Sequence, residues 1–287
     1  MNVPKLLLTS LTWLCMSPLL MASHAAESPT SDTLAHINAD PPLVSRKGDT
    51  LYYTGSLNAA AIERIVAQYP PTSQLRRLVI DSTGGEVNIG MKFGHWVRDL
   101  QLDVEVTTLC FSSCANYIFP AGQAKIIGPK ALVGWHGSTF QQNFMTLASM
   151  REEIRPSMEA SFPQLPPEVK KDLDFERFLT QQTATFFADM ETSRQHEVAL
   201  YKRLQITSDL ANLQEYCRLS PGQYTLTLAG MKSLGLQNVS GPADYPRSAL
   251  TYLNQRRSEK TPPLPPLDIS VMQGLNCQLQ SESPQTL

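Results

Sequence analysis

The sequence predicts an α/β fold with a parallel sheet, because strand-like and helix-like segments alternate in its central part. We expect buried strands at residues 78–80, 104–109 and 131–136, with helices at 86–100 and 114–119 between them. Strands that alternate with helices in this way pair in parallel through crossover connections. The turns after the first two strands carry glycine or serine, so backbone amides and a hydroxyl are expected at the ends of these units.

The first 25 residues have the features of a secretory signal peptide. Lys5 gives a short positive start, residues 6–22 are apolar, and Ser23-His24-Ala25 offers small residues for cleavage after Ala25. The apolar run is short for a membrane-spanning helix, and Pro18 interrupts it. We therefore expect an exported protein, periplasmic or secreted, with no stable membrane insertion after cleavage.

Composition and charge limit the classes of partner. An apolar content of 42% and a charged content of 17% are typical of a globular protein with a substantial core. The formal net charge of −2 gives no reason to expect a nucleic acid as partner. Histidines and cysteines do not occur at the spacing of a metal site, so we expect no metal and no other cofactor.

The cysteines predict disulfide bonds. Removal of the signal peptide takes away Cys15 and leaves an even number of cysteines in an oxidising compartment. Cys110 and Cys114 bracket a serine turn, so a bond between them would fix the shape of that turn. Cys217 and Cys277 would then tie down the C-terminal segment. Buried free thiols are the alternative.

Outside the central pattern the sequence changes character. We expect the α/β domain to cover residues 49–245, after a flexible leader at 26–48. Within the domain, residues 141–213 read mainly as helix and predict a helical insertion. Residues 258–287 are Pro-rich and polar, which predicts an extended tail.

Three features of the central part form a candidate acyl-transfer site. Gly84 and Gly85 follow the first strand, Ser113 stands before the helix at 114–119, and His136 ends a later strand. Backbone amides can hold an oxyanion, a serine hydroxyl can act as nucleophile, and an imidazole can take its proton. Each feature alone is common, since a serine before a helix often only caps it. The combination favours catalysis.

With these residues the chain resembles the Clp protease proteolytic subunit of the ClpP/crotonase superfamily, and its exported relatives, over roughly residues 50–239. DSTGGEV (81–87) is similar to the glycine turn of that family, SSCANYIFPAG (112–122) to its nucleophile turn, and VGWHG (133–137) to its histidine segment. LTLAGMKSLGLQNV (226–239) is similar to its last helix and strand. The resemblance implies a core of repeated strand-strand-helix units with a helical insertion that covers the site or mediates assembly.

The resemblance also implies roles for individual residues. Ser113 corresponds to the nucleophile and His136 to the general base, and the amides of Gly85 and Cys114 correspond to the oxyanion hole. Ser112 is the neighbouring alternative for the nucleophile. The spacing to the Ala-Gly end of the following helix favours Ser113.

The catalytic acid of the resembled family has no direct counterpart. Gln223 stands at its place, and an amide oxygen can orient an imidazole but cannot offset its charge. Asp209 and Glu215 lie upstream and are the other candidates for an orienting residue. A Ser–His pair without a third residue is a further alternative.

These observations predict an exported serine peptidase that acts on peptides or unfolded protein segments without ATP, and that self-associates into a homo-oligomer. An ATP-driven unfoldase partner is not expected for an exported protein. The first alternative is a catalytically inactive binding or scaffold protein, which the missing acid favours. The second is a crotonase-type acyl-CoA enzyme, which export away from coenzyme A disfavours.

Overall fold

The computed structural model of the 287-residue chain describes residues 31–140, 146–171, 173–219, 222–260, 262–274 and 277. The predicted signal peptide, residues 1–25, lies outside the described residues. Among the helices that are described, none is both long enough and apolar enough to cross a membrane.

The described elements follow one another as α1 (Ser31–His36), β1 (Leu43–Lys47), β2 (Thr50–Thr54), α2 (Ala59–Gln68), β3 (Arg77–Asp81), α3 (Val87–Asp99), β4 (Asp103–Val106), β5 (Leu109–Phe111), η1 (Cys114–Ile118), β6 (Lys125–Ile127), β7 (Leu132–Gly134), α4 (Leu147–Ser161), η3 (Phe162–Gln164), α5 (Pro167–Lys170), α6 (Phe175–Leu204), η4 (Ser208–Ala211), α7 (Leu213–Tyr216), β8 (Tyr224–Leu226), α8 (Leu228–Ser233), β9 (Val239–Ser240), α9 (Arg247–Ser258) and β10 (Ser270–Met272).

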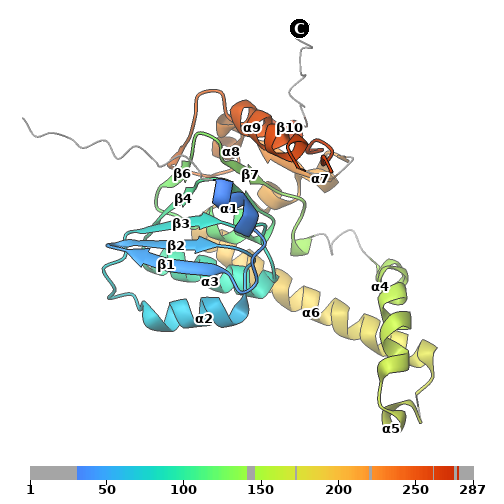
Figure 1. Cartoon of the computed structure of the whole chain (residues 1–287). Helices are drawn as coiled ribbons and strands as arrows, with labels where there is room; N and C mark the ends of the chain where they lie inside the picture. The colour runs from blue at the N-terminus through green and yellow to red at the C-terminus, as the bar shows by residue number, and fades with distance from the viewer. Residues whose placement is uncertain are drawn as a thin grey trace, which may run out of the picture.

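A mostly parallel sheet lies at the centre of the fold and confirms the predicted α/β class. Its strand order is β1-β2-β3-β4-β6-β9, and every neighbouring pair is parallel except β1 with β2. In the register of this sheet, Leu78 of β3 lies between Leu51 of β2 and Val104 of β4, and all three side chains are fully buried. Helices α2 and α3 cover one face of the sheet (Figure 1). Apolar strands covered in this way form the core that positions the turns at their ends.

Two short parallel pairs extend the central sheet on the side of the candidate site. β5 pairs with β7, and β8 pairs with β10. A bridge between Ser82 and Cys110 links the end of β3 to β5, and a bridge between Trp135 and Tyr224 links the end of β7 to β8. The carboxyl ends of β3, β5 and β7 are therefore neighbours in space.

Close packing holds α3 against η1. A Cβ atom built on Gly94 would lie 2.3 Å from the carbonyl oxygen of Tyr117, and one built on Gly90 would lie 3.1 Å from the Cβ of Ser113. Larger residues would push η1 away from α3. The glycines of α3 therefore set the distance between this helix and the serine turn.

Both ends of the domain contain structure that the sequence did not predict. In the expected leader, β1 pairs with β2 along its whole length. In the expected tail, β10 pairs with β8, and the amide of Leu267 donates to the side-chain oxygen of Asn254 at 2.7 Å. The expected tail thus returns to the sheet at least as far as Met272.

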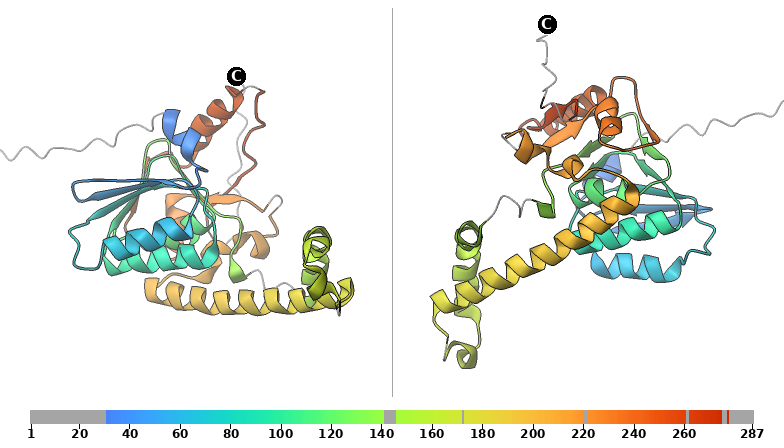
Figure 2. Two further views of the ribbon diagram at one scale, coloured as in Figure 1. Left: turned by 60° about the horizontal axis from the view of Figure 1, so that its bottom comes forward. Right: turned by 180° about the vertical axis from the view of Figure 1, so that it is seen from behind.

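The predicted helical insertion at 141–213 contains α4, η3, α5, α6 and η4. α4 and α5 lie at the far end of the long helix α6, away from the sheet (Figures 1 and 2). The other end of α6 packs on α3. We call residues 146–171 and 173–190 the helical arm, and the other described residues the sheet body. Residues 141–145, at the start of the insertion, lie outside the described residues.

Both predicted disulfides are confirmed. Cys110 and Cys114 are joined with their Cα atoms 5.3 Å apart, and Cys217 and Cys277 with theirs 5.2 Å apart. The first bond ties β5 to η1 across the serine turn. The second ties α7 to the C-terminal segment.

Candidate active site

The serine turn joins β5 to η1 through a residue with an unusual backbone. β5 ends at Phe111, and Ser112 has a φ of +57°, in the left-handed region that residues other than glycine seldom occupy. The amide of Ser112 donates to the carbonyl of Gly134 on β7, and its carbonyl accepts from the amide of Asn116 in η1. Such local strain is often retained at functional sites, where the surrounding contacts fix it.

His136 follows β7 and points its imidazole at this turn. Its Nε2 atom lies 2.7 Å from the Oγ atom of Ser112. The ring also stacks on Phe111, with centroids 5.3 Å apart and planes 25° from parallel. β5 and β7 are paired, so the sheet itself places the serine and the histidine side by side.

The structure corrects the predicted identity of the serine that contacts the histidine. Ser113 is 2% exposed, and its hydroxyl donates to the carbonyl oxygen of Gly85 at 2.8 Å. Ser112, the alternative, is the residue that faces His136. The reason is that the left-handed turn falls at Ser112, directly after β5, whereas Ser113 already has helical backbone angles and points towards α3.

The glycine turn after β3 approaches the serine turn closely. Gly84 has a φ of +98°, and a Cβ atom built on it would lie 2.7 Å from the Cβ of Ser112 and 3.0 Å from the amide nitrogen of Ser113. Only glycine fits both this conformation and this contact. Gly85, a predicted oxyanion donor, faces the turn through its carbonyl oxygen, which accepts from Ser113.

The other predicted oxyanion donor, Cys114, is the first residue of η1. Amides in the first turn of a helix lack partners within the helix, so they can bind an anion. With Ser112 facing His136, the amide of the next residue, Ser113, joins Cys114 and Gly85 as a candidate donor, as in strand-turn-helix nucleophile sites. The assignment of the oxyanion hole stays a prediction.

His136 is suited to accept a proton at neutral pH. Partial burial lowers its pKa below the usual value, and a hydrogen bond to its own backbone opposes this effect only in part. A lowered pKa leaves the imidazole neutral at pH 7. A neutral imidazole with its Nε2 atom towards a hydroxyl is the arrangement that general-base catalysis needs.

Two of the predicted orienting residues, Asp209 and Glu215, are bonded within their own segment. Gln223 lies close to His136 along the backbone, because its neighbour Tyr224 pairs with Trp135 in an antiparallel bridge. Asp209 accepts from the hydroxyl of Thr207 at 2.7 Å, Glu215 accepts from the side-chain amide of Gln214 at 3.3 Å, and the carbonyl of Gln223 accepts from the amide of Ser270. Within the part of the chain that the structure describes, no carboxylate is hydrogen-bonded to His136.

Sequence reasoning missed a buried polar group behind the site. Glu197 of α6 is 0% exposed, and one of its oxygens accepts from both the amide and the hydroxyl of Thr139, three residues after His136. The signal that could have predicted this burial is the position of Glu197 on the buried face of its helix. The residues at helical spacing from it are also buried, namely Ser193, Leu200 and Tyr201.

Two further features do not belong to this site. A cavity of about 600 Å³ lies among α2, α3 and α6, with His95, Trp96 and His196 in its lining, which does not include Ser112 or His136. Among the described residues, His, Cys, Asp and Glu form no cluster of three or more that could hold a metal ion.

Comparison with known proteins adds little to this picture. No protein-family model matches the chain, and no curated protein is similar to it. Among solved structures, a ClpP1 mutant from Listeria monocytogenes is similar to 44% of this chain and 79% of its own, with 17% sequence identity and a TM-score of 0.28. A similarity this low assigns neither fold nor activity.

Proposed function

We propose that this chain is an exported serine peptidase in which Ser112 is the nucleophile and His136 the general base. The observation that carries the proposal is the 2.7 Å contact between the Oγ atom of Ser112 and the Nε2 atom of His136. A general base must lie within about 2.6–3.2 Å of the atom whose proton it takes. The left-handed turn at Ser112 and the lowered pKa of His136 support the same roles.

The reaction would proceed in two steps. Ser112 gives its hydroxyl proton to His136, and its oxygen attacks the peptide carbonyl, whose oxyanion is held by amides of the glycine and serine turns. His136 then protonates the departing amine, which leaves an ester on Ser112. In the second step His136 takes a proton from water, the resulting hydroxide attacks the ester, and the acid is released as the proton returns to Ser112.

The substrate class and the location are parts of the same proposal. Peptides or unfolded segments are expected from the sequence resemblance described above, and self-association into a homo-oligomer is expected on the same ground. Two disulfides in the described chain are compatible with an extracellular or periplasmic location. Hydrolysis by this pair needs no ATP.

A fluorophosphonate probe, which reacts with activated serines, tests the proposal in the mature protein. We expect labelling of the wild type, and a loss of at least about 10³-fold in the labelling rate of Ser112→Ala. Ser113→Ala is the matched control, and it should label within about tenfold of the wild type because it loses only a bond to the Gly85 carbonyl. If labelling is lost in Ser113→Ala but kept in Ser112→Ala, Ser113 is the nucleophile instead.

A binding or scaffold protein is the second candidate, because no carboxylate among the described residues orients His136. A serine–histidine pair without such a group has a poorly oriented base and a less stable imidazolium. Absence of labelling in the wild type between about pH 5 and pH 9 would favour the scaffold and contradict the peptidase.

A further inference from the structure

A short segment after His136 connects the candidate site to the long helix α6. Asn116 of η1 donates from its side-chain nitrogen to the carbonyl of Gly137 at 2.8 Å. Glu197 of α6 accepts from the amide of Thr139 at 3.1 Å and also from the hydroxyl of Thr139. The hydroxyl of Ser138 donates to the side chain of Asn212. The residues that follow His136 are thus hydrogen-bonded to η1, to α6 and to the residue before α7.

Glu197 stands among buried polar atoms that have no hydrogen-bond partner. These atoms are the second oxygen of Glu197, the hydroxyls of Tyr117 and Tyr201, and the side-chain oxygen of Asn116. Both tyrosines interact electrostatically with Glu197, and the Tyr117 hydroxyl adjoins its carboxylate without the geometry of a good hydrogen bond. Buried unpartnered groups are rare in folded proteins, and a group of them indicates a functional constraint or bound water.

We propose that Glu197 is a positioning residue, which fixes His136 opposite Ser112 through its bonds to Thr139. This inference rests on the proposed function of the Ser112–His136 pair. Glu197 does not touch the reacting atoms and acts only through the segment that follows the histidine. A shift of about 1 Å in a catalytic group can reduce a rate by about 100-fold, so this support matters for reactivity.

The charge of Glu197 changes near neutral pH. Burial raises its pKa to about 7, although the bonds from Thr139 oppose the rise. Hydrogen bonds to an ionised carboxylate are stronger than bonds to a neutral one, so the ionised form holds Thr139 more firmly. The reactivity of Ser112 should therefore increase as the pH rises through about 7.

The tyrosines near Glu197 do not change charge in this range. Tyr117 of η1 and Tyr201 of α6 face it, and burial raises the pKa of both well above the usual value of tyrosine. Glu86, at the start of α3, acts on Tyr117, and Tyr224 of β8 acts on Tyr201. Burial raises the pKa of Tyr224 as well. Glu197 is therefore the group beside Thr139 whose charge changes near pH 7.

The test is the pH dependence of fluorophosphonate labelling in the wild type and in Glu197→Gln, which keeps the shape of the side chain and removes its charge. The wild-type rate should rise in two stages, one below pH 6.5 from His136 and one near pH 7 from Glu197. Glu197→Gln should lack the second stage and label roughly tenfold more slowly at pH 8. A profile that superimposes on the wild type would overturn the proposal.

Two controls separate this inference from the proposed function. Glu191→Gln changes a half-buried glutamate of the same helix, paired with Arg194, and should leave the profile unchanged. NMR titration of His136, assigned with His136→Asn, needs no catalysis: the wild-type imidazole should show a second inflection near pH 7 that Glu197→Gln lacks. That inflection without any labelling would support the positioning role while contradicting the peptidase, and its absence would overturn the positioning role.

Discussion

The sheet body and the helical arm are stabilised in different ways. The body buries one continuous core that includes Tyr53, Phe93 and Trp135. In the arm, Met150, Phe178 and Leu179 are buried but do not belong to that core, and Phe162 packs on Phe178 with ring centroids 5.2 Å apart. The arm therefore has a small core of its own, joined to the body through α6.

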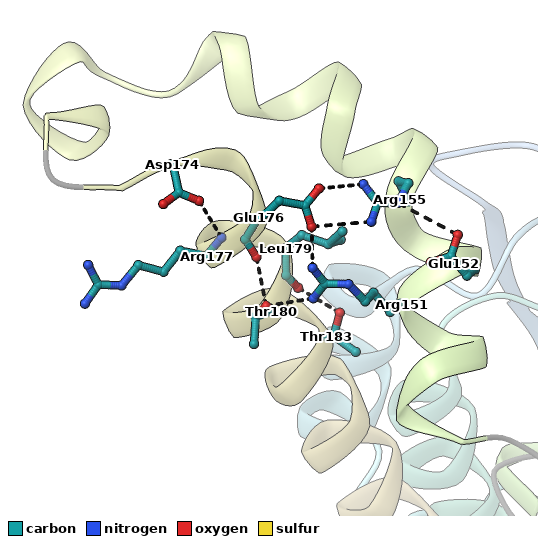
Figure 3. Close-up of polar contacts among 9 residues, drawn as sticks. All are labelled: Arg151, Glu152, Arg155, Asp174, Glu176, Arg177, Leu179, Thr180 and Thr183. Atoms are coloured by element: carbon teal, nitrogen blue, oxygen red, sulfur yellow. Dashed lines mark hydrogen bonds and ion pairs between the residues drawn. The ribbon is translucent and has the colours of Figure 1, made fainter.

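Carboxylates show the same contrast. In the body, Asp81 is buried and accepts from the amides of Thr107, Thr108 and Leu109. In the arm, Glu176 is 59% exposed and pairs with Arg151 and Arg155 (Figure 3). A buried carboxylate bonded to backbone amides fixes the path of the chain, whereas an exposed ion pair contributes little. The body is thus expected to be rigid and the arm separable, with Glu197 of α6 as the contact between the arm's long helix and the site.

Loss of the long-range disulfide should give the largest effect, and it should appear in the body. Cys217 and Cys277 are 60 residues apart, and a bond that closes such a loop contributes roughly 4 kcal/mol. We expect the double substitution Cys217→Ser, Cys277→Ser to lower the free energy of unfolding by about that amount. Urea unfolding followed by the fluorescence of Trp96 and Trp135, both in the body, measures it.

The short disulfide is the comparison for this experiment. Cys110 and Cys114 are only 4 residues apart, and the same model gives roughly 2 kcal/mol for their bond. Equal losses for the two pairs would show that the bond at the serine turn does more than close a loop. If helical structure is lost at the same urea concentration as the tryptophan fluorescence changes, in every variant, the arm is not separable from the body.

A change at the contact between α3 and η1 should have the next largest effect. Gly94→Ala places a methyl group 2.3 Å from the carbonyl oxygen of Tyr117, so η1 must shift. Overpacking of this kind costs about 1–3 kcal/mol, which the better helix propensity of alanine offsets by about 1 kcal/mol. We expect a net loss of up to about 2 kcal/mol and at least about tenfold slower labelling of Ser112.

Lys92→Ala provides the control for Gly94→Ala. Lys92 lies on the same helix, is exposed, and pairs with Glu63. Its loss should change stability by less than about 1 kcal/mol and leave labelling unchanged. A labelling rate that Gly94→Ala does not alter would show that the serine turn tolerates movement of η1.

The sequence predicted the body well because its elements have strong local signals. The apolar centre of β3 is followed by a glycine turn at Gly84. The helix at Phe175–Leu204, which the arm shares with the body, was likewise expected at the observed bounds. β1 and β10 escaped prediction for the opposite reason. β1 is exposed throughout and β10 is mostly half-buried, so neither shows the apolar alternation of a strand packed on a core.

The serine that contacts His136 was predicted to within one residue, and the difference has a physical cause. Ser112 and Ser113 both fit a turn between a strand and a helix, and only the sign of φ at Ser112 decides which hydroxyl faces His136. That angle depends on the pairing of β5 with β7 and on the approach of Gly84, which are contacts between distant segments. Glu197 was missed because its partner Thr139 lies in another part of the chain.

The smallest effect is expected from the arm, at the ion pairs of Glu176. Its Oε1 atom lies 2.8 Å from Arg155, and this arginine and Arg151 lower the pKa of the exposed carboxyl. Because the group is solvated, Glu176→Ala should lower the midpoint of thermal unfolding by no more than about 2 °C, and salt at about 1 M should abolish the difference.

The labelling rate of Ser112 in Glu176→Ala decides whether the arm and the body are independent. Glu153→Ala, at an exposed position of α4, controls for the loss of a surface charge near the arm. If the small core of the arm stands alone, both variants should label at the wild-type rate to within about twofold. A several-fold loss confined to Glu176→Ala would mean that α6 transmits changes at the arm to Glu197, and the arm would then be a part of the site.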